Sequence, residues 1–320
     1  MDRADHLGKP VAAPRRILCI GGAAIDRFYE TAEAPRIGTS NPAWGWTSDG
    51  GVARNAAEVL VRLGAEAVLA SMVGADEAGA GLKRRIEACR IDGAFVAVNR
   101  QRRTAEYIGV FHRGELFAAV ADMDIFDDMD ERFCETPLAA AGKIAGVFAD
   151  CNLATDALTT LRTHCRKAHL PLAIDAVSLA KSQRLGNDLR GIRLLCLNRD
   201  EAMTLAGTDR PDQAVAALRR RGAQAVTLGE GRHGVRAGDE TGIFTLTMPQ
   251  TEVANVSGAG DALAAGAFLG CLEGASLRQA VELGMACAQA ALSSPRSIPE
   301  EFDRNEAERR QRIVAEANGR

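Results

Sequence analysis

Residues 258–261 read GAGD, three small residues and a carboxylate that could together bind an anion and accept a proton. The small side chains leave the backbone N–H groups of Gly258, Ala259 and Gly260 uncovered, and the apolar run after them is typical of a helix. These amides would lie at a helix N-terminus, which favours negative charge. Asp261 in a first helical turn would also suit the helix dipole without any chemistry. The whole string favours an anion pocket with a carboxylate at its rim.

Asn198 and Glu201 stand three residues apart, directly after the apolar run 194–197. At this spacing an asparagine can cap a helix while the glutamate bonds back to it, forming a capping box. The same pair offers the oxygen ligands that Mg²⁺ prefers. No G-K-[ST] string occurs, so a kinase with this sequence would lack the lysine of a P-loop. Taken alone, the pair indicates a helix cap. Together with the GAGD string, it indicates a role in binding Mg²⁺ near a phosphate.

Residues 229–234, GEGRHG, match the G-x-G-x-x-G pattern of dinucleotide-binding folds and follow the apolar run 225–228. That pattern indicates a dinucleotide site only where a helix begins at its third glycine. Here residues 235–238 and 242–247 have strand character instead. We therefore exclude the dinucleotide fold and expect a turn between two strands. A plain hairpin turn without any ligand would explain the same residues.

The composition narrows the class of protein. The 320 residues are 47% apolar and 25% charged, as in globular enzymes, and the net charge of −3 argues against nucleic-acid or anionic-membrane partners held by bulk electrostatics. The eight cysteines include no C-x-x-C pair, which predicts free thiols in a reducing compartment. No uncharged stretch reaches transmembrane length, and residues 1–16 lack the apolar core of a signal peptide. We expect a cytoplasmic protein.

The elements that must position these residues follow an alternating pattern. Short apolar runs predict strands at 17–21, 67–72, 146–149, 172–175, 194–197 and 225–228, and amphipathic stretches predict helices at 53–63, 79–89, 154–167, 201–205 and 213–221. The alternation predicts a doubly wound α/β sheet flanked by helices, over residues 16–299. The polar residues 1–15 and the charged residues 300–320, which have helical propensity, are expected to be solvated tails.

One region breaks the alternation. Residues 104–111 and 115–120 are two strand-like runs joined at 112–114, which is a hairpin pattern. Together with the loop-rich residues 28–48 they predict a small β lid over a substrate site. The lid segments would then lie at about 28–48 and 103–121.

The GAGD string followed by A-x-x-A-G resembles the C-terminal signature of the ribokinase-like, or PfkB, carbohydrate and nucleoside kinases. The resemblance implies a ribokinase-like fold with a β lid and an ATP-dependent transfer to a hydroxyl group. It also implies that Asp261 is the general base. The amides of Gly258, Ala259 and Gly260 would hold the transferring phosphate.

The same resemblance implies an ATP site. Residues 226–229, VTLG, with Gly231 match a turn that lies against ATP in this family, and Asn198 with Glu201 matches a motif that organises Mg²⁺ through water. Potassium activation stays open, because Asn255 lacks the charge that many relatives have near a monovalent cation. The expected ATP-site residues are Asn198, Thr227, Gly229, Gly231, Ser257, Gly258, Gly260 and Cys287.

The N-terminal half resembles the sugar side of that family. Residues 50–55, GGVARN, match its first signature, in which Gly51 and Asn55 would bind sugar hydroxyls. Asp26 matches an aspartate that binds vicinal hydroxyls, and one carboxylate can accept from two adjacent O–H groups. A turn residue at a strand end is the alternative interpretation of Asp26. Ala24 stands where many members have asparagine.

Four further strings resemble bacterial pseudouridine kinases of this family: SNP at 40–42, ADM at 121–123, ADCN at 149–152 and NVS at 255–257. The expected substrate contacts also include Asn41 and Asp122 from these strings, and Thr104. The C–C glycosidic bond of pseudouridine leaves its N1–H free, and Asp122 is the expected acceptor. The resemblance implies phosphorylation of the pseudouridine 5′-hydroxyl. A kinase for ribose, a purine nucleoside or a sugar acid, and a non-catalytic ligand-binding relative, are the alternatives.

The expected partners are a small nucleoside or sugar and a second copy of the chain. Lid strands can pair across a dimer in this family, and the unpaired edge of the predicted lid is the feature of this sequence that agrees with it.

Overall fold

The structure, a computed structural model, describes residues 14–254, 257–294 and 298–320 and is built on a nine-stranded sheet. The strand order is β13-β12-β11-β10-β9-β8-β1-β4-β5, parallel from β11 to β5 and antiparallel from β11 to β13. The strands are β1 (Arg16–Ile20), β4 (Glu66–Gly74), β5 (Asp92–Asn99), β8 (Gly146–Asp150), β9 (Leu172–Asp175), β10 (Leu194–Asn198), β11 (Ala225–Gly229), β12 (Val235–Asp239) and β13 (Gly242–Leu246). All six predicted strands are present, which confirms the predicted α/β sheet.

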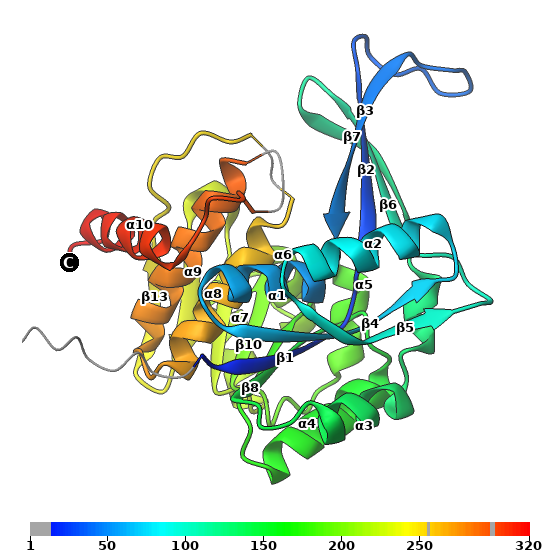
Figure 1. Ribbon diagram of the computed structural model, residues 1–320. Coiled ribbons are helices and arrows are strands. Elements are labelled where there is room, and N and C mark those ends of the chain that lie inside the picture. The colour runs from blue at the N-terminus through cyan, green and yellow to red at the C-terminus, as the bar shows by residue number, and fades with distance from the viewer. Residues whose placement is uncertain (1–13, 255–256, 295–297) are drawn as a thin grey trace, which may run out of the picture.

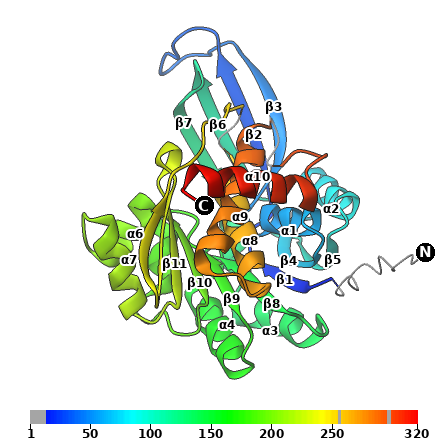
Figure 2. The ribbon, with the colours of Figure 1, turned by 90° about the vertical axis from the view of Figure 1, so that its left-hand side faces the viewer.

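Two groups of helices cover the two faces of this sheet (Figures 1 and 2). Successive strand residues face opposite sides, so Ile17 and Cys19 join the core of α1, α2, α8, α9 and α10, whereas Leu18 and Ile20 join that of α3, α4, α6 and α7. The helices are α1 (Val52–Arg62), α2 (Glu77–Ala88), α3 (Glu131–Ala140), α4 (Thr155–Lys167), α5 (Leu179–Ser182), α6 (Arg199–Ala206), α7 (Pro211–Arg220), α8 (Ala259–Leu272), α9 (Leu277–Leu292) and α10 (Arg304–Ala317).

Helix α8 is fixed by close packing against α9. A Cβ on Gly266 would come within 2.7 Å of the Cys287 Sγ, and one on Gly284 within 2.4 Å of the Leu263 carbonyl oxygen. The small residues therefore let the two backbones approach. Helix α8 begins beside the carboxyl ends of β10 and β11, the edge at which open α/β sheets bind ligands.

A second sheet of four strands, in the order β3-β2-β6-β7, projects from the body in Figure 1. Its strands are β2 (Ala24–Thr31), β3 (Ala43–Gly50), β6 (Glu106–His112) and β7 (Glu115–Asp122). Positive φ angles of 53° at Arg113 and 76° at Gly114 make the tight turn between β6 and β7, as the hairpin pattern predicted. In the segment 28–48, expected to be rich in loop, residues 32–42 are loop, whereas β2 continues to Thr31 and β3 begins at Ala43.

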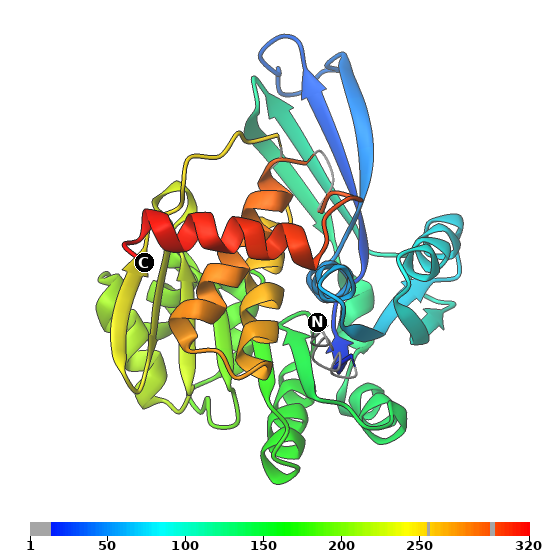
Figure 3. The same ribbon diagram turned by 60° about the vertical axis from the view of Figure 1, so that its left-hand side comes forward.

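Residues 300–320 are not a solvated tail. Helix α10 lies across α8 and α9 in Figure 3, with Ala307, Val314 and Ala315 buried. The Arg304 guanidinium also pairs with the Glu273 carboxylate at 2.8 Å. The prediction of a tail was wrong because these few apolar residues are spaced along one face of a highly charged helix. Residues 1–13 lie outside the described part of the chain.

The short 3-10 turn Gly231–His233 leads into β12, not into a helix, which confirms that the G-x-G-x-x-G string does not build a dinucleotide fold. Within the described ranges, no helix has both the length and the apolar character needed to cross a membrane.

Candidate active site

Two cavities meet at the N-terminus of α8. The first, of about 380 Å³, is lined by Gly258 and Asp261 and by lid residues, and we call it the lid cavity. The second, of about 550 Å³, is lined by Ala259, Gly260 and the turn after β11, and we call it the glycine-turn cavity. Gly258 is the N-cap of α8, with a left-handed φ of 79° that favours glycine. The first amides of a helix lack partners within it, so this end can bind an anion between the cavities.

Asp261 is half-buried and faces the lid cavity. Its Oδ2 accepts a hydrogen bond from the Asn55 Nδ2 at 2.7 Å. Burial raises the pKa of the Asp261 carboxyl to about 6, against the lowering effect of the Asn55 hydrogen bond and of the Arg54 charge. A carboxyl with a pKa near neutrality can take a proton from a hydroxyl group and release it again.

Asp26 lies on β2, 8% exposed, and lines the same cavity. Burial, followed by the negative charge of Asp261, raises the pKa of the Asp26 carboxyl to about 7. Gly50 lies against this side chain, because a Cβ there would stand 2.4 Å from the Asp26 oxygens. The carboxyls of Asp26 on β2 and Asp261 on α8 both line the lid cavity, so one ligand can contact both of them.

Gly51 and Asn55 complete this group at the start of α1. Gly51 has a φ of 93°, and a Cβ on it would lie 2.4 Å from the Gly22 carbonyl oxygen, so the position requires glycine. Asn55 follows in the first turn of α1, 4% exposed, and lines the lid cavity with Asp26 and Asp261. The structure therefore brings together the three residues expected to bind sugar hydroxyls and the expected general base: Asp26, Gly51, Asn55 and Asp261.

Asp150, at the end of β8, holds this end of the sheet together. Its fully buried carboxylate accepts hydrogen bonds from the backbone N–H groups of Gly22, Ala53 and Asn152, each at 2.9 Å. It thereby fixes β1, α1 and β8 relative to one another. No role had been predicted for it, although an aspartate directly after a buried strand was the available signal.

The far wall of the lid cavity is apolar, with two polar side chains that the sequence analysis gave no role. The Lys181 Nζ contacts the Asn152 Oδ1 and lies 5.8 Å from the centroid of the Phe126 ring. Burial lowers the pKa of Lys181. Lys181 follows β9 on the four-residue helix α5, which was too short to be predicted. The apolar lining residues of this wall are Phe28, Tyr107, Phe111, Leu116, Met123 and Phe126.

The glycine-turn cavity offers mainly backbone and apolar side chains. Four residues expected at the ATP site line it, namely Asn198, Gly229, Gly231 and Gly260, and so do the polar residues Arg232, Gln250 and Thr251. A Cβ on Gly231 or Gly260 would meet no atom within 4 Å, so the backbone there is open to a ligand. These residues fit a flat nucleotide base beside open backbone amides. The apolar part of the lining is Val235, Met248, Val253, Leu263, Ala288 and Leu292.

Asn198 and Glu201 form the capping box of α6. The Asn198 Oδ1 accepts from the Glu201 N–H at 2.9 Å, and the Glu201 carboxylate accepts from the Asn198 N–H at 2.9 Å and from its Nδ2 at 2.7 Å. Both carboxylate oxygens are thus engaged, and burial raises the pKa of Glu201. No cluster of three or more metal-ligating side chains occurs among the described residues. The pair fits Mg²⁺ only through water, which stays a prediction.

Three predicted substrate contacts are not part of the lid cavity. Asn41 is exposed in the loop between β2 and β3, where its side chain bonds the Arg36 backbone at 2.8 and 3.1 Å. The Thr104 hydroxyl donates to Asp76 at 2.6 Å and accepts from the Gly74 N–H at 2.9 Å, so it holds a turn. Asp122 is exposed at the end of β7. The next residue along, Met123, lines the cavity instead.

Four expected ATP contacts do not line the glycine-turn cavity: Thr227, Cys287, Ser257 and Gly258, the last of which lines the lid cavity. Thr227 is 1% exposed inside β11, and Cys287 is fully buried between α8 and α9, so neither lines the glycine-turn cavity. Ser257 lines the lid cavity rather than the glycine-turn cavity. Sequence position alone could not separate residues that line a cavity from those one layer beneath it. Asn255, which the potassium question concerned, lies outside the described residues.

Comparison with known proteins shows the family and the fold of the chain. The profile of the pfkB family carbohydrate kinases matches residues 14–301. The chain is 30% identical over 284 residues to the pseudouridine kinase of Escherichia coli (strain K12), covering 87% of this chain and 90% of that protein. A carbohydrate kinase from Agrobacterium tumefaciens has a similar structure, with a TM-score of 0.80 at 30% identity, over 94% of this chain and 98% of that chain. Arabidopsis thaliana ribokinase complexed with ribose and ATP shares the fold, with a TM-score of 0.79 at 20% identity, over 93% and 99% of the two chains.

Proposed function

The chain belongs to the pfkB family of carbohydrate kinases and is a phosphotransferase acting on a hydroxyl group; from this premise we propose that it phosphorylates the 5′-hydroxyl of pseudouridine with ATP. The observation that carries the proposal is the N-terminus of α8, where the lid cavity and the glycine-turn cavity meet. The similarity to the pseudouridine kinase of Escherichia coli supports the choice of nucleoside.

In this mechanism Asp261 accepts the proton of the 5′-hydroxyl as that oxygen attacks the γ-phosphate of ATP in line. The amides of Gly258, Ala259 and Gly260 hold the charge that grows on the transferring phosphoryl group. ATP occupies the glycine-turn cavity and the nucleoside occupies the lid cavity. When bound, Mg²⁺ neutralises phosphate charge, and Asn198 and Glu201 would hold it through water.

The ribose would lie against Asp26, Gly51 and Asn55. The Asp26 carboxylate can accept from two vicinal hydroxyl groups at once. Asn55 already donates to Asp261 from its Nδ2 at 2.7 Å, so a hydroxyl group held by Asn55 lies next to the base. This arrangement supports a pentose whose 5′-hydroxyl points at α8.

The nucleobase would lie against the aromatic wall of the lid cavity. Asp122 is exposed and lies outside this cavity, so it is not the polar contact of the nucleobase in this proposal. Lys181 and Asn152 line the cavity and take that role instead. A lysine donates to a carbonyl oxygen of the base, and an asparagine can accept from an N–H group. Lys181→Ala should therefore weaken nucleoside binding more than ribose binding.

Residues 16–299 form the kinase domain in this proposal, and the segments at about 28–48 and 103–121 form its lid. Closure of the lid would exclude water and limit wasteful ATP hydrolysis. The charged residues 300–320 add helix α10, which packs on the core of this domain. Potassium activation stays open.

Two copies would pair through their lids. The edge strands β3 and β7 expose large apolar side chains, with Trp44 59%, Phe117 51% and Val120 65% exposed. Exposed strand edges are ready to pair with another chain. Sedimentation of the wild type should show a dimer that the double variant Trp44→Ser, Phe117→Ser converts to a monomer, and a monomeric wild type at micromolar concentration would contradict the pairing.

We place the protein in the cytoplasm because all eight cysteines are free thiols and six of them are buried. Thiol titration of the denatured protein purified without oxidant should find all eight. A lower count would indicate disulfides and an oxidising compartment.

The test is ADP release from Mg·ATP with pseudouridine, uridine, adenosine, inosine and ribose in parallel, with the Asp261→Asn protein as the blank. Turnover that depends on Asp261 and occurs with pseudouridine alone would support the proposal. Turnover of another acceptor would keep the mechanism and discard the substrate. No turnover with any of the five would favour a different acceptor or a ligand-binding role.

A further inference from the structure

Arg54 lies directly before Asn55 on α1 and is almost completely buried, with 2% of its surface exposed. Its Nη1 donates to the Asn55 Oδ1 at 2.9 Å, and the Asn55 Nδ2 donates to the Asp261 Oδ2 at 2.7 Å. A continuous chain of hydrogen bonds therefore joins Arg54 to the carboxyl assigned as the base. No role had been predicted for Arg54.

The chain of contacts fixes which way the Asn55 amide faces. A guanidinium only donates, so Arg54 must face the amide oxygen of Asn55. The amide nitrogen is then left to face Asp261, whose carboxylate only accepts. Without Arg54 only the ionised form of Asp261 would keep the amide nitrogen facing the base, because a protonated carboxyl can also donate to the amide oxygen.

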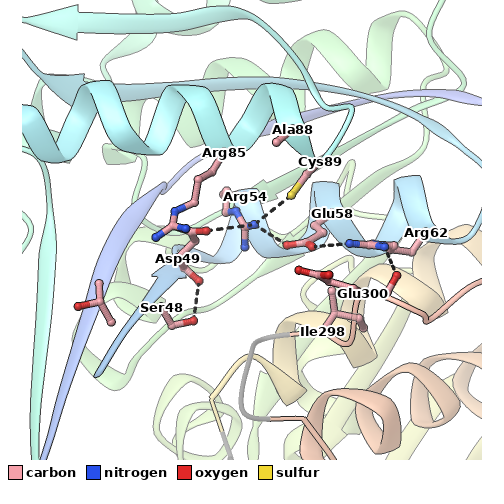
Figure 4. A pocket seen from close by; sticks show the side chains of 11 residues that line it. Ser48, Asp49, Arg54, Glu58, Arg62, Arg85, Ala88, Cys89, Ile298 and Glu300 are labelled. Atoms are coloured by element: carbon pink, nitrogen blue, oxygen red, sulfur yellow. Dashed lines mark hydrogen bonds and ion pairs between the residues drawn. The ribbon is translucent and has the colours of Figure 1, made fainter. Parts of the chain in front are cut away.

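Arg54 is itself held from the side away from Asn55. Figure 4 shows its guanidinium between Glu58, which it contacts directly, and Asp49, at 3.9 Å. The Cys89 Sγ lies 3.7 Å from the Arg54 Nη2. These groups line a polar cavity of about 320 Å³ that also contains Arg62 and Arg85, which we call the arginine pocket.

Burying this charge is unfavourable for folding unless it is fully paired. The Arg54 Nε is buried and has no hydrogen-bond partner. An apolar residue on α1 would avoid that penalty. The position therefore carries a charged side chain at some expense in stability, as is common where a side chain serves a site.

We propose that Arg54 is a positioning residue for Asp261, acting through the Asn55 amide and through its own positive charge. The inference rests on the proposed role of Asp261 as the base, but on no particular acceptor. Arg54 touches neither the lid cavity nor the glycine-turn cavity, so it acts on the base from behind.

The charges around Asp261 show what that positive charge does. Asp26 on β2, Asp150 at the end of β8 and Asp175 at the end of β9 all interact unfavourably with an ionised Asp261. Arg54 is the cation that lowers the pKa of Asp261 and of Asp26.

The groups that face Arg54 in turn are the Glu58 and Asp49 carboxylates and the Cys89 thiol, with Arg62 and Arg85 pairing to those carboxylates from outside. Carboxylates of the arginine pocket thus pair with the Arg54 guanidinium on one side, and on the other side its positive charge acts on Asp261. Removing it should raise the pKa of Asp261.

Arg62 provides a matched control. It lies two turns further along α1, lines the arginine pocket and pairs with the same Glu58 at 3.4 Å, but it makes no contact with Asn55. Arg62→Met removes an arginine from the pocket and leaves the chain to Asp261 intact. Any effect of Arg54→Met beyond that of Arg62→Met is then attributable to Asn55 and Asp261.

The experiment measures kcat and KM against pH for wild type, Arg54→Met, Arg54→Lys and Arg62→Met, with the acceptor that the substrate panel identifies. Arg54→Met should lose between about 10-fold and 10²-fold in kcat, as expected for a misplaced reacting group, with little change in KM for ATP. Its acidic limb should move to higher pH. Arg54→Lys keeps the charge but not the planar fork, so it should lose kcat while its acidic limb stays near that of the wild type.

The proposal is overturned if Arg54→Met keeps the wild-type acidic limb and loses no more kcat than Arg62→Met. Should Arg54→Met fail to fold, Arg54→Lys carries the test, and wild-type kcat in that variant would overturn the role of the fork. An active Asp261→Asn protein would refute the assigned base itself. An inactive Asp261→Asn protein beside a fully active Arg54→Met protein would refute only the positioning role.

Discussion

The two cavities that meet at α8 bind by different means. The lid cavity presents charged and polar side chains, namely Asp26, Asn55, Asp261 and Lys181, against aromatic rings. The glycine-turn cavity presents mainly glycine backbone and apolar side chains, with Asn198, Arg232, Gln250 and Thr251 as its polar lining residues. In the proposed function, the acceptor would therefore meet mostly charged and polar side chains, and the nucleotide would meet mostly apolar side chains and glycine backbone.

Because the two linings differ, each kind of substitution should affect one cavity and not the other. Changing a carboxyl to an amide should damage the lid cavity and leave nucleotide binding intact. Adding a methyl group should damage the glycine-turn cavity and leave acceptor binding intact.

Asp261→Asn should lower kcat by at least about 10², because the general base is lost while the helix N-terminus stays in place. The KM for ATP should change little. Steady-state ADP release at saturating acceptor measures both quantities. The exposed Asp209→Asn serves as the matched control, and a rate for Asp261→Asn near that of Asp209→Asn would contradict the assignment.

Asp26→Asn should raise the KM for the acceptor by roughly 10-fold to 10²-fold, because a charged partner of the sugar hydroxyls becomes neutral. The KM for ATP should be unaffected, since Asp26 lies in the other cavity. Initial rates over a matrix of both substrates separate the two constants. Equal increases in both would show that the cavities do not divide recognition in this way.

The pH profile should report the two raised carboxyl pKa values in sequence. Both groups act as carboxylates, so activity is high above their pKa values and falls as the pH drops. The ratio kcat/KM for the acceptor should fall first, as Asp26 takes up a proton near pH 7, and kcat should fall below about pH 6 as Asp261 does. Each group contributes at most about a tenfold loss per pH unit. A flat profile from pH 5 to 8 would exclude both roles.

Gly260→Ala should have the smallest effect and act on the other cavity. Its Cβ would meet no protein atom within 4 Å, so the fold tolerates it, and a helical glycine replaced by alanine gains a little stability. The new methyl group would occupy room meant for the nucleotide, so the KM for ATP should rise severalfold. Gly81→Ala in α2 is the control for helix stability, and a rise in acceptor KM alone for Gly260→Ala would reverse the assignment of the cavities.

The sequence predicted the buried strands of the main sheet well, but it did not predict strand β5 or the docking of helix α10. Strands buried on both faces appear as continuous apolar runs, and those runs predicted six strands of the main sheet. Strand β5 was missed although residues 94–98 form an apolar run; it is a half-exposed edge strand that begins Asp92-Gly93. The docking of α10 was missed because its buried alanines and valine are scattered among charges.

For the site, the sequence indicated the glycines at which helices begin, and the roles of these glycines stay predictions. Gly51 and Gly258 stand where the chain requires a positive φ, and each positions a helix start. Prediction failed for Asp150, whose three backbone donors come from separate segments, with Gly22 128 residues away. It also failed for Asp122, because neighbouring strand residues face opposite sides and only the fold shows which side is the cavity.

The two tryptophans of the chain, Trp44 and Trp46, both lie on β3 of the projecting sheet. The Trp46 ring centroid is 5.5 Å from that of Phe28, which lines the lid cavity. Light absorbed by indole therefore samples this one sheet and not the nine-stranded body. The protein carries its own optical probe, and a stopped-flow emission trace could time the arrival of an acceptor without any attached dye.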